Sequence, residues 1–346
     1  MNRLRVGFFW AFMTLALSPL WSQEHGVVVS GGWCLPNESA YGYISQPTID
    51  VGYLCEWRQS EGWRLGLRAD AMMMRKAIAG TRYTLAVTVE DKMWGPIDEL
   101  LELGLSAYDN PYRSSHNEDN EMIGSYLNCH LGVGFRYRKL IDSTYTLSAS
   151  LRFVHSSNGY LLKPNHGLNY LQAEVGFHLT PSSHRLSEAA GGASSTLRPL
   201  TFFCSYAPGV VQQRRRNIVA VYCYAHSLLL GTLHPFSSRR SLGGEVDLMY
   251  NYAHWEAARL DGVDTPLPLY VGLCGTYQRN WQRLFVRVSL GTDLIRSPYL
   301  LGAMYERISF NCRLTESRRV TPYAGVACKA YYAHIDYIEW TLGVEF

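Results

Sequence analysis

Residues 128–138 read NCHLGVGFRYR, and apolar and polar side chains alternate along them. One face of an extended strand would receive the apolar residues Leu131, Val133, Phe135 and Tyr137. The opposite face would receive histidine, glycine and arginine, because successive side chains of a strand point to opposite sides. Apolar residues on one face and charged residues on the other predict a strand with lipid on one side and a wet interior on the other.

The same alternation recurs along the chain in segments of about ten residues separated by turn chemistry. In residues 280–291, NWQRLFVRVSLG, the apolar set is Leu284, Val286, Val288 and Leu290. The last segment, YIEWTLGVEF, ends in Phe346, and a closing aromatic resembles the C-terminal signature of bacterial outer-membrane barrels. We therefore predict an all-β fold, a transmembrane antiparallel up-and-down β-barrel of about 12 to 16 strands.

Composition supports the same class of protein. Aromatic residues make up 13% of the 346 residues and charged residues only 18%, which suits strands with an apolar outer surface. Residues 1–22 carry two arginines followed by an apolar core, so we expect a signal peptide. After it no apolar run reaches about 18 residues, so no helical membrane span is expected. Residues 23–346 would form the barrel.

One segment interrupts the alternation. Residues 180–200, TPSSHRLSEAAGGASSTLRPL, are rich in serine, alanine and glycine. They fit either a flexible linker between two small barrels or a long periplasmic turn within a single barrel, and we favour the turn. The connection 139–144 is short and the polar stretches 109–120 and 156–168 are longer, so the strand that starts near Tyr145 is expected to run outward.

A group of polar residues extends the lipid-facing side of that outward strand. His155 and Ser157 share the parity of Leu151 and Phe153, and on the next strand Asn169 shares the parity of the apolar set. A tight return would place Asn169 beside His155. This arrangement offers a nucleophile in Ser157, a base in His155 and an orienting amide in Asn169, the general logic of a catalytic triad.

Two neighbours complete the predicted site. Asn158 and the backbone N–H of Gly159 are candidates for stabilising an oxyanion. No metal or other cofactor is expected. The alternative interpretation is that HSSNG, residues 155–159, is an ordinary outer turn in which Asn-Gly is used for its backbone geometry.

The motif H-x-S-N at residues 155–158, followed by P-N-x-G at 164–167, resembles the outer-membrane lipid A 3-O-deacylase or acyloxyacyl hydrolase family. The resemblance implies a membrane barrel in which His155 is the base and Ser157 the nucleophile that removes an ester-linked acyl chain from lipopolysaccharide. The third member of the family's triad is a glutamate fourteen residues after the histidine. That position is Asn169 here.

An asparagine at this position also makes the motif similar to outer-membrane phospholipase A, whose triad is Ser-His-Asn. The calcium-binding loop of that enzyme is not evident in residues 160–163, and the P-N-x-G motif favours the deacylase. A phospholipase A, or a non-catalytic porin or structural barrel, remains the alternative.

The expected location is the outer membrane of a Gram-negative bacterium. The expected partner is lipopolysaccharide, through its lipid A in the outer leaflet, and no nucleic acid. Arg214, Arg215 and Arg216 are expected in an outer loop, where guanidinium groups can meet lipid A phosphates.

Overall fold

The computed structural model describes residues 24–35, 46–58, 63–74, 79–179, 200–213, 221–262, 264, 268–295, 302–315, 319–332 and 334–346. These residues form sixteen strands and a helix, α2. The predicted signal peptide 1–22, Arg214 to Arg216 and the interrupting segment up to residue 199 lie outside the described residues. Across the described ranges, no helix has the length and hydropathy needed to cross a bilayer.

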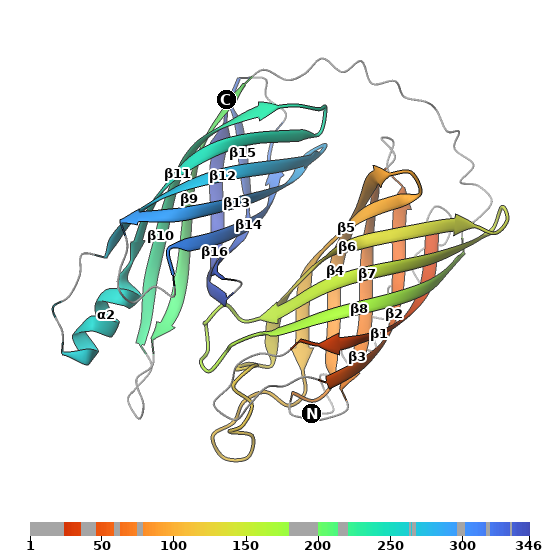
Figure 1. Ribbon diagram of the computed structural model, residues 1–346, viewed down its shortest axis with the longest axis horizontal. Helices are drawn as coiled ribbons and strands as arrows, with labels where there is room; N and C mark the ends of the chain where they lie inside the picture. The colour runs from red at the N-terminus through yellow and green to blue at the C-terminus, as the bar shows by residue number, and fades with distance from the viewer. Residues whose placement is uncertain are drawn as a thin grey trace. The chain divides into compact units, whose positions relative to one another are not determined.

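The first eight strands form one closed antiparallel barrel, in which each strand pairs with the next. They are β1 (Glu24–Cys34), β2 (Gln46–Arg58), β3 (Arg64–Met74), β4 (Arg82–Trp94), β5 (Ile97–Tyr108), β6 (Leu127–Leu140), β7 (Tyr145–Ser157) and β8 (Leu168–Leu179) (Figure 1). The barrel closes because β8 returns to β1, in a register that runs from Cys34 opposite Tyr170 to His25 opposite Leu179.

The remaining strands form a second closed barrel of the same kind. They are β9 (Thr201–Gln213), β10 (Val221–Pro235), β11 (Arg240–Asn251), β12 (Leu269–Trp281), β13 (Leu284–Ile295), β14 (Met304–Arg313), β15 (Thr321–Tyr331) and β16 (His334–Glu345). Strand β9 pairs with both β10 and β16. Between β11 and β12 lies α2 (Tyr252–Asp261). Asn251 caps its start, where the side chain accepts the Ala253 N–H, and Gly262 caps its end.

A single barrel of 12 to 16 strands over residues 23–346 is therefore a wrong prediction, and the alternative of two small barrels describes the structure. The strand segments were recognisable because alternation is a local property. Closure is not local: whether β8 pairs with β1 or with β9 leaves the alternation within each strand unchanged. The interrupting segment of residues 180–200 separates the last strand of one barrel from the first strand of the other.

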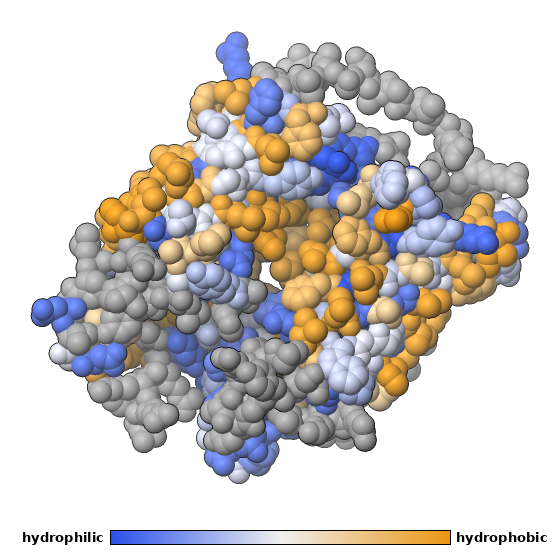
Figure 2. Space-filling view, in the orientation of Figure 1, coloured by the Kyte–Doolittle hydropathy of each residue, from blue (hydrophilic) through white to orange (hydrophobic). Residues whose placement is uncertain are grey.

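The predicted alternation itself is confirmed. In β6, Val133, Phe135 and Tyr137 are exposed, whereas Arg136 is buried. In the last strand Trp340 and Leu342 are exposed as well. On the face that Figure 2 shows, many of the outward side chains of the strands are hydrophobic, as a lipid-facing wall requires.

Ion pairs cross the interior of the first barrel. Arg136 on β6 reaches Glu174 on β8 at 2.9 Å, Glu56 on β2 at 3.4 Å, and Glu90 on β4. Arg68 on β3 contacts the other oxygen of Glu174 at 2.7 Å. An eight-stranded barrel has an interior just wide enough to be filled by side chains, and these pairs bridge it from opposite walls.

The second barrel is bridged in the same way. Arg307 on β14 donates to Asp247 on β11 at 2.7 Å, to Glu339 on β16 at 2.8 Å and to Ser227 on β10 at 2.9 Å. Arg287 lies with its guanidinium carbon 3.7 Å from the centroid of the Phe203 ring. Buried side chains thus meet across both interiors, as expected for barrels of eight strands.

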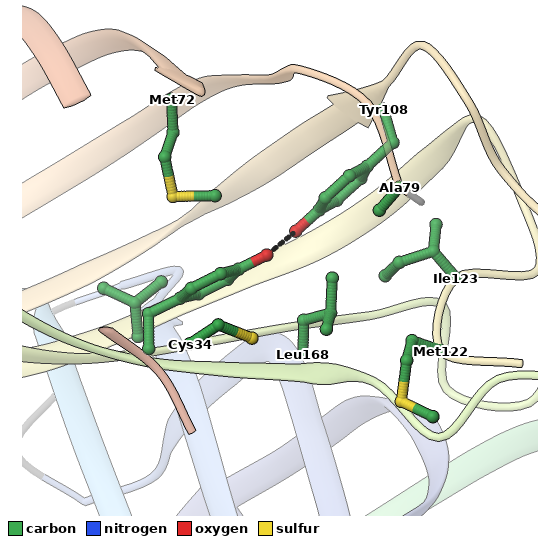
Figure 3. Close-up of a cluster of buried hydrophobic side chains, with 9 residues drawn as sticks. Cys34, Met72, Ala79, Tyr108, Met122, Ile123 and Leu168 are labelled. Carbon is green, nitrogen blue, oxygen red and sulfur yellow. Dashed lines mark hydrogen bonds between the residues drawn. The ribbon is translucent and has the colours of Figure 1, made fainter. Parts of the chain in front are cut away.

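An apolar cluster fills the first barrel near the ends of β5, β7 and β8 (Figure 3). Tyr108 and Tyr170 meet there through their hydroxyl groups at 3.1 Å, and the guanidinium of Arg82 lies 5.0 Å from the Tyr170 ring centroid. Met122 and Ile123 join this cluster from the connection between β5 and β6. The long connection is thereby packed against the strand ends that carry the site described next.

Replacing Arg136 with alanine should destabilise the first barrel by about 3–5 kcal/mol, because buried carboxylates lose their counter-charge. The measurement is urea-induced unfolding of the purified, refolded protein followed by tryptophan fluorescence. Lys139→Ala, at an exposed position on the same strand, is the control and should leave the transition unchanged. Coincident transitions for Arg136→Ala and the wild type would mean that the interior ion pairs contribute no stability.

Candidate active site

The site is built on the hairpin of β7 and β8. His155 lies directly opposite Asn169 in the register of this pair. Its Nδ1 is 2.7 Å from Asn169 Oδ1, so the predicted contact is present. Because an amide oxygen can only accept, Nδ1 carries the hydrogen of the neutral ring and Nε2 holds the lone pair of a base.

Ser157 lies two residues beyond His155 on the same outward face of β7, whereas Ser156 points into the barrel and is buried. The Ser157 Oγ accepts a hydrogen bond from Asn165 Nδ2 at 2.7 Å. The Asn165 amide is therefore next to the oxygen that the sequence predicts as the nucleophile. The sequence pointed to Asn165 only as part of the P-N-x-G motif and assigned it no contact.

Gly167 fits closely against the imidazole ring of His155. A Cβ at this position would lie 2.7 Å from His155 Cε1, and the glycine has a φ of 74°, a conformation that disfavours other residues. Its N–H donates to the carbonyl of Met122 at 2.9 Å, and that of His166 to the carbonyl of Glu121 at 3.1 Å. The connection between β5 and β6 thus holds the return segment 165–167 in place.

The parity prediction holds along most of β7, where Leu151 and Phe153 are exposed on the outer surface. His155 and Ser157 continue this face, yet only 8% and 1% of their surfaces are exposed. Open contact of these two side chains with lipid is therefore a wrong prediction. The return segment contacts both of them, because Asn165 bonds Ser157 and Gly167 lies against His155.

The two predicted oxyanion donors lie beside this group. The Asn158 N–H donates to Asn165 Oδ1 at 3.3 Å, and the Asn158 side chain donates to Ser125 Oγ at 2.9 Å. Asn158 therefore fixes the amide of Asn165 in the orientation that presents its Nδ2 to Ser157. Gly159 has a φ of 61° and forms the turn that follows the strand. The direct oxyanion role of Asn158 and Gly159 remains a prediction.

Among the described residues, one group has donor atoms close enough to hold a metal ion: Glu24, Glu56 and His178. Both carboxylates bond the guanidinium of Arg138, Glu24 at 2.9 Å and Glu56 at 2.7 Å. A cation in that position would displace or repel Arg138, so the group is better suited to its ion pair. It contains no member of the His155 site.

The chain thus contains two all-β barrels, with a serine, a histidine and an asparagine gathered on the outer face of the first. The family model of lipid A 3-O-deacylase (PagL) matches residues 43–178, which lie within that barrel and include the whole site. The resemblance predicted from the two motifs is confirmed over this range. The comparisons do not show a similarity to outer-membrane phospholipase A.

Solved structures of outer-membrane proteins are similar at low identity. The outer membrane enzyme PagL is 20% identical, with 44% of this chain and 97% of that chain covered and a TM-score of 0.32. Neisserial surface protein A is 14% identical, with coverages of 45% and 96% and a TM-score of 0.31. The outer membrane protein opdK from Pseudomonas aeruginosa is 7% identical, with 94% and 98% covered and a TM-score of 0.26. No curated protein matches the chain.

Proposed function

We propose that this chain is an ester hydrolase of the outer membrane of a Gram-negative bacterium that removes an ester-linked acyl chain from lipid A. The observation that carries the proposal is the 2.7 Å contact of His155 Nδ1 with Asn169 Oδ1, beside Ser157 on the outer face of a barrel wall. The match of residues 43–178 to the lipid A 3-O-deacylase family supports lipid A as the substrate.

Loop lengths support an orientation in which the site lies at the outer leaflet. At one end of the first barrel, residues 95–96 and 141–144 form short connections. At the other end, residues 109–126 and 158–167 form longer ones. Short turns face the periplasm in outer-membrane barrels, so β7 runs outward and carries His155 and Ser157 toward lipopolysaccharide.

The hydrogen bonds of the site are consistent with a serine mechanism. Ser157 Oγ accepts from Asn165, and this bond does not use the hydroxyl hydrogen. We propose that His155 Nε2 receives this hydrogen as a proton during the reaction. In the reaction, Oγ attacks the ester carbonyl while His155 takes the proton. His155 then returns that proton to the leaving sugar hydroxyl, and the acyl group stays on Ser157. Water, deprotonated by His155, releases the fatty acid and restores the serine.

The Asn165 amide is placed to stabilise the negative charge that develops on the substrate. Its Nδ2 lies 2.7 Å from the attacking oxygen, and its orientation is fixed by the N–H of Asn158. A preorganised donor of this kind contributes through its fixed position, because it need not reorient as the charge forms. Ser157 is only 1% exposed, so the side chains over it must move for the ester carbonyl to reach Oγ.

Asn169 takes the place of the family's glutamate. Its amide oxygen holds His155 in the tautomer with the hydrogen on Nδ1, which is the tautomer a base needs at Nε2. Because the amide is neutral, it stabilises the protonated imidazole less than a carboxylate does. We therefore assign Asn169 an orienting role.

The alternatives receive less support. The same three side chains suit a phospholipid ester, but the family match favours lipid A. The function of a porin or other passive barrel would not require the His155–Asn169 pair. Buried ion pairs also cross the interior of each barrel, where a porin has its channel. Arg214, Arg215 and Arg216 stay predicted contacts to lipid A phosphates, outside the described residues.

Replacing Ser157 with alanine should abolish deacylation, because no other group on the outward face of β7 replaces the nucleophile. The measurement is mass spectrometry of lipid A from cells expressing the wild type or the variant. A hydroxyacyl chain should be missing only with the wild type. Ser156→Ala is the matched control, since this neighbouring serine points into the barrel, and it should behave as the wild type.

Two outcomes would contradict the proposal. Lysophospholipid release that depends on Ser157, with intact lipid A, would identify a phospholipase. Intact lipid A and phospholipids with every variant, when the wild type is present in the outer membrane, would identify a barrel without this activity.

Asn169→Ala should lower the rate of deacylation by roughly 10- to 100-fold, the effect of removing a hydrogen bond that positions His155. Asn169→Glu should retain activity, because a carboxylate also accepts from Nδ1. Initial rates on purified lipid A in detergent give the comparison. If Asn169→Ala is as active as the wild type, Asn169 has no orienting role.

A further inference from the structure

The outer face of the second barrel carries a histidine surrounded by tyrosines. Tyr206 is on β9, Tyr224 and His226 are on β10, and Tyr250 is on β11. His226 lies directly opposite Tyr250 in the β10–β11 register. We call these four residues the His226 cluster. None of them has a part in the Ser157 site, which lies in the other barrel.

The cluster has a defined geometry. Tyr206 OH and His226 Nδ1 are 2.7 Å apart, and their rings stack at an interplanar angle of 11°. Tyr224 stacks on the imidazole at a centroid distance of 6.4 Å, and the Tyr250 ring lies 6.2 Å from it. Tyr224 has 65% of its surface exposed, so the cluster is accessible from outside the barrel.

The two nitrogens of the His226 ring differ in their surroundings. Nδ1 is hydrogen-bonded to the Tyr206 hydroxyl, whereas no described residue is hydrogen-bonded to Nε2. At the edge of the hydrocarbon, a polar N–H that has left bulk water is stabilised by a new polar partner. A polar group of the lipid headgroup can supply that partner.

The position of the His226 cluster along the strands indicates which part of a lipid it contacts. On β10 the same face continues into Leu228 and Leu230, both exposed, so hydrocarbon contact begins just beyond His226. Residues 236–239 and 282–283 form short turns at the end of the second barrel that is opposite to His226. By the same loop-length rule as for the first barrel, the His226 cluster lies on the outer-leaflet side, at the level of the headgroups.

We propose that the His226 cluster is a binding site for the phosphate of a phosphorylated glycolipid in the outer leaflet. The imidazole and the hydroxyl groups of Tyr224 and Tyr250 supply donors for the phosphate oxygens, while the ring faces pack against the sugar. The aromatic belt of a membrane barrel would explain tyrosines at this depth. It would not explain a histidine whose imidazole is hydrogen-bonded to one of them. The site depends on the orientation proposed above and not on catalysis at Ser157.

The test is native mass spectrometry of the full-length protein in detergent, titrated with bisphosphorylated lipid A. All samples carry Ser157→Ala, so that the probe is not consumed. His226→Phe keeps an aromatic ring at this position and removes both ring nitrogens. It should weaken binding of one lipid A by about 10-fold, the effect of losing a hydrogen bond to a charged group. His234→Phe is the matched control, since His234 is on the same face of β10 near the opposite end.

Chemically different probes separate the possible results. Lipid A without phosphates should bind the Ser157→Ala parent and the His226→Phe variant equally. The proposal is overturned if His226→Phe binds bisphosphorylated lipid A as tightly as the parent, or if His234→Phe weakens binding as much. Equal weakening toward phosphatidylglycerol would also overturn it, because the cluster would then bind lipid phosphates without preference for a glycolipid. Unchanged heat-modifiability on gels establishes that each variant is folded.

Discussion

The pairing of β8 with β1 is the constraint on which the rest of the first barrel depends. A bilayer offers no water to unpaired backbone groups, so a sheet in lipid must close on itself. Closure after eight strands gives a narrow interior, and the arginine and glutamate side chains of opposite walls then meet within it. The wall that results is a rigid support for chemistry on its outer face.

The candidate site uses that support at one end of a hairpin. Opposite positions on β7 and β8 bring His155 and Asn169 together without any contribution from a loop. Ser157 is on the same strand, but its partner Asn165 comes from the return segment. The carbonyls of Glu121 and Met122 bond this segment. The strands thus place the proposed base and its proposed orienting group, and the connections place the groups around the proposed nucleophile.

Local patterns were enough to predict the strands, their two faces and the His155–Asn169 contact, since all three follow from alternation and a single hairpin. The number of barrels was not predictable in this way, because pairing between β1 and β8 joins segments far apart in the sequence. The Asn165–Ser157 bond and the cover over His155 were missed for a related reason. Both depend on where residues 121 and 122 contact residues 166 and 167.

The central claim is that one closed barrel contains the whole active site. Expression of residues 1–179 alone, followed by mass spectrometry of lipid A from the same cells, tests it directly. The account predicts that the short chain folds in the outer membrane and removes the same acyl chain as the full-length protein. A short chain that is folded in the outer membrane but leaves lipid A intact would contradict it.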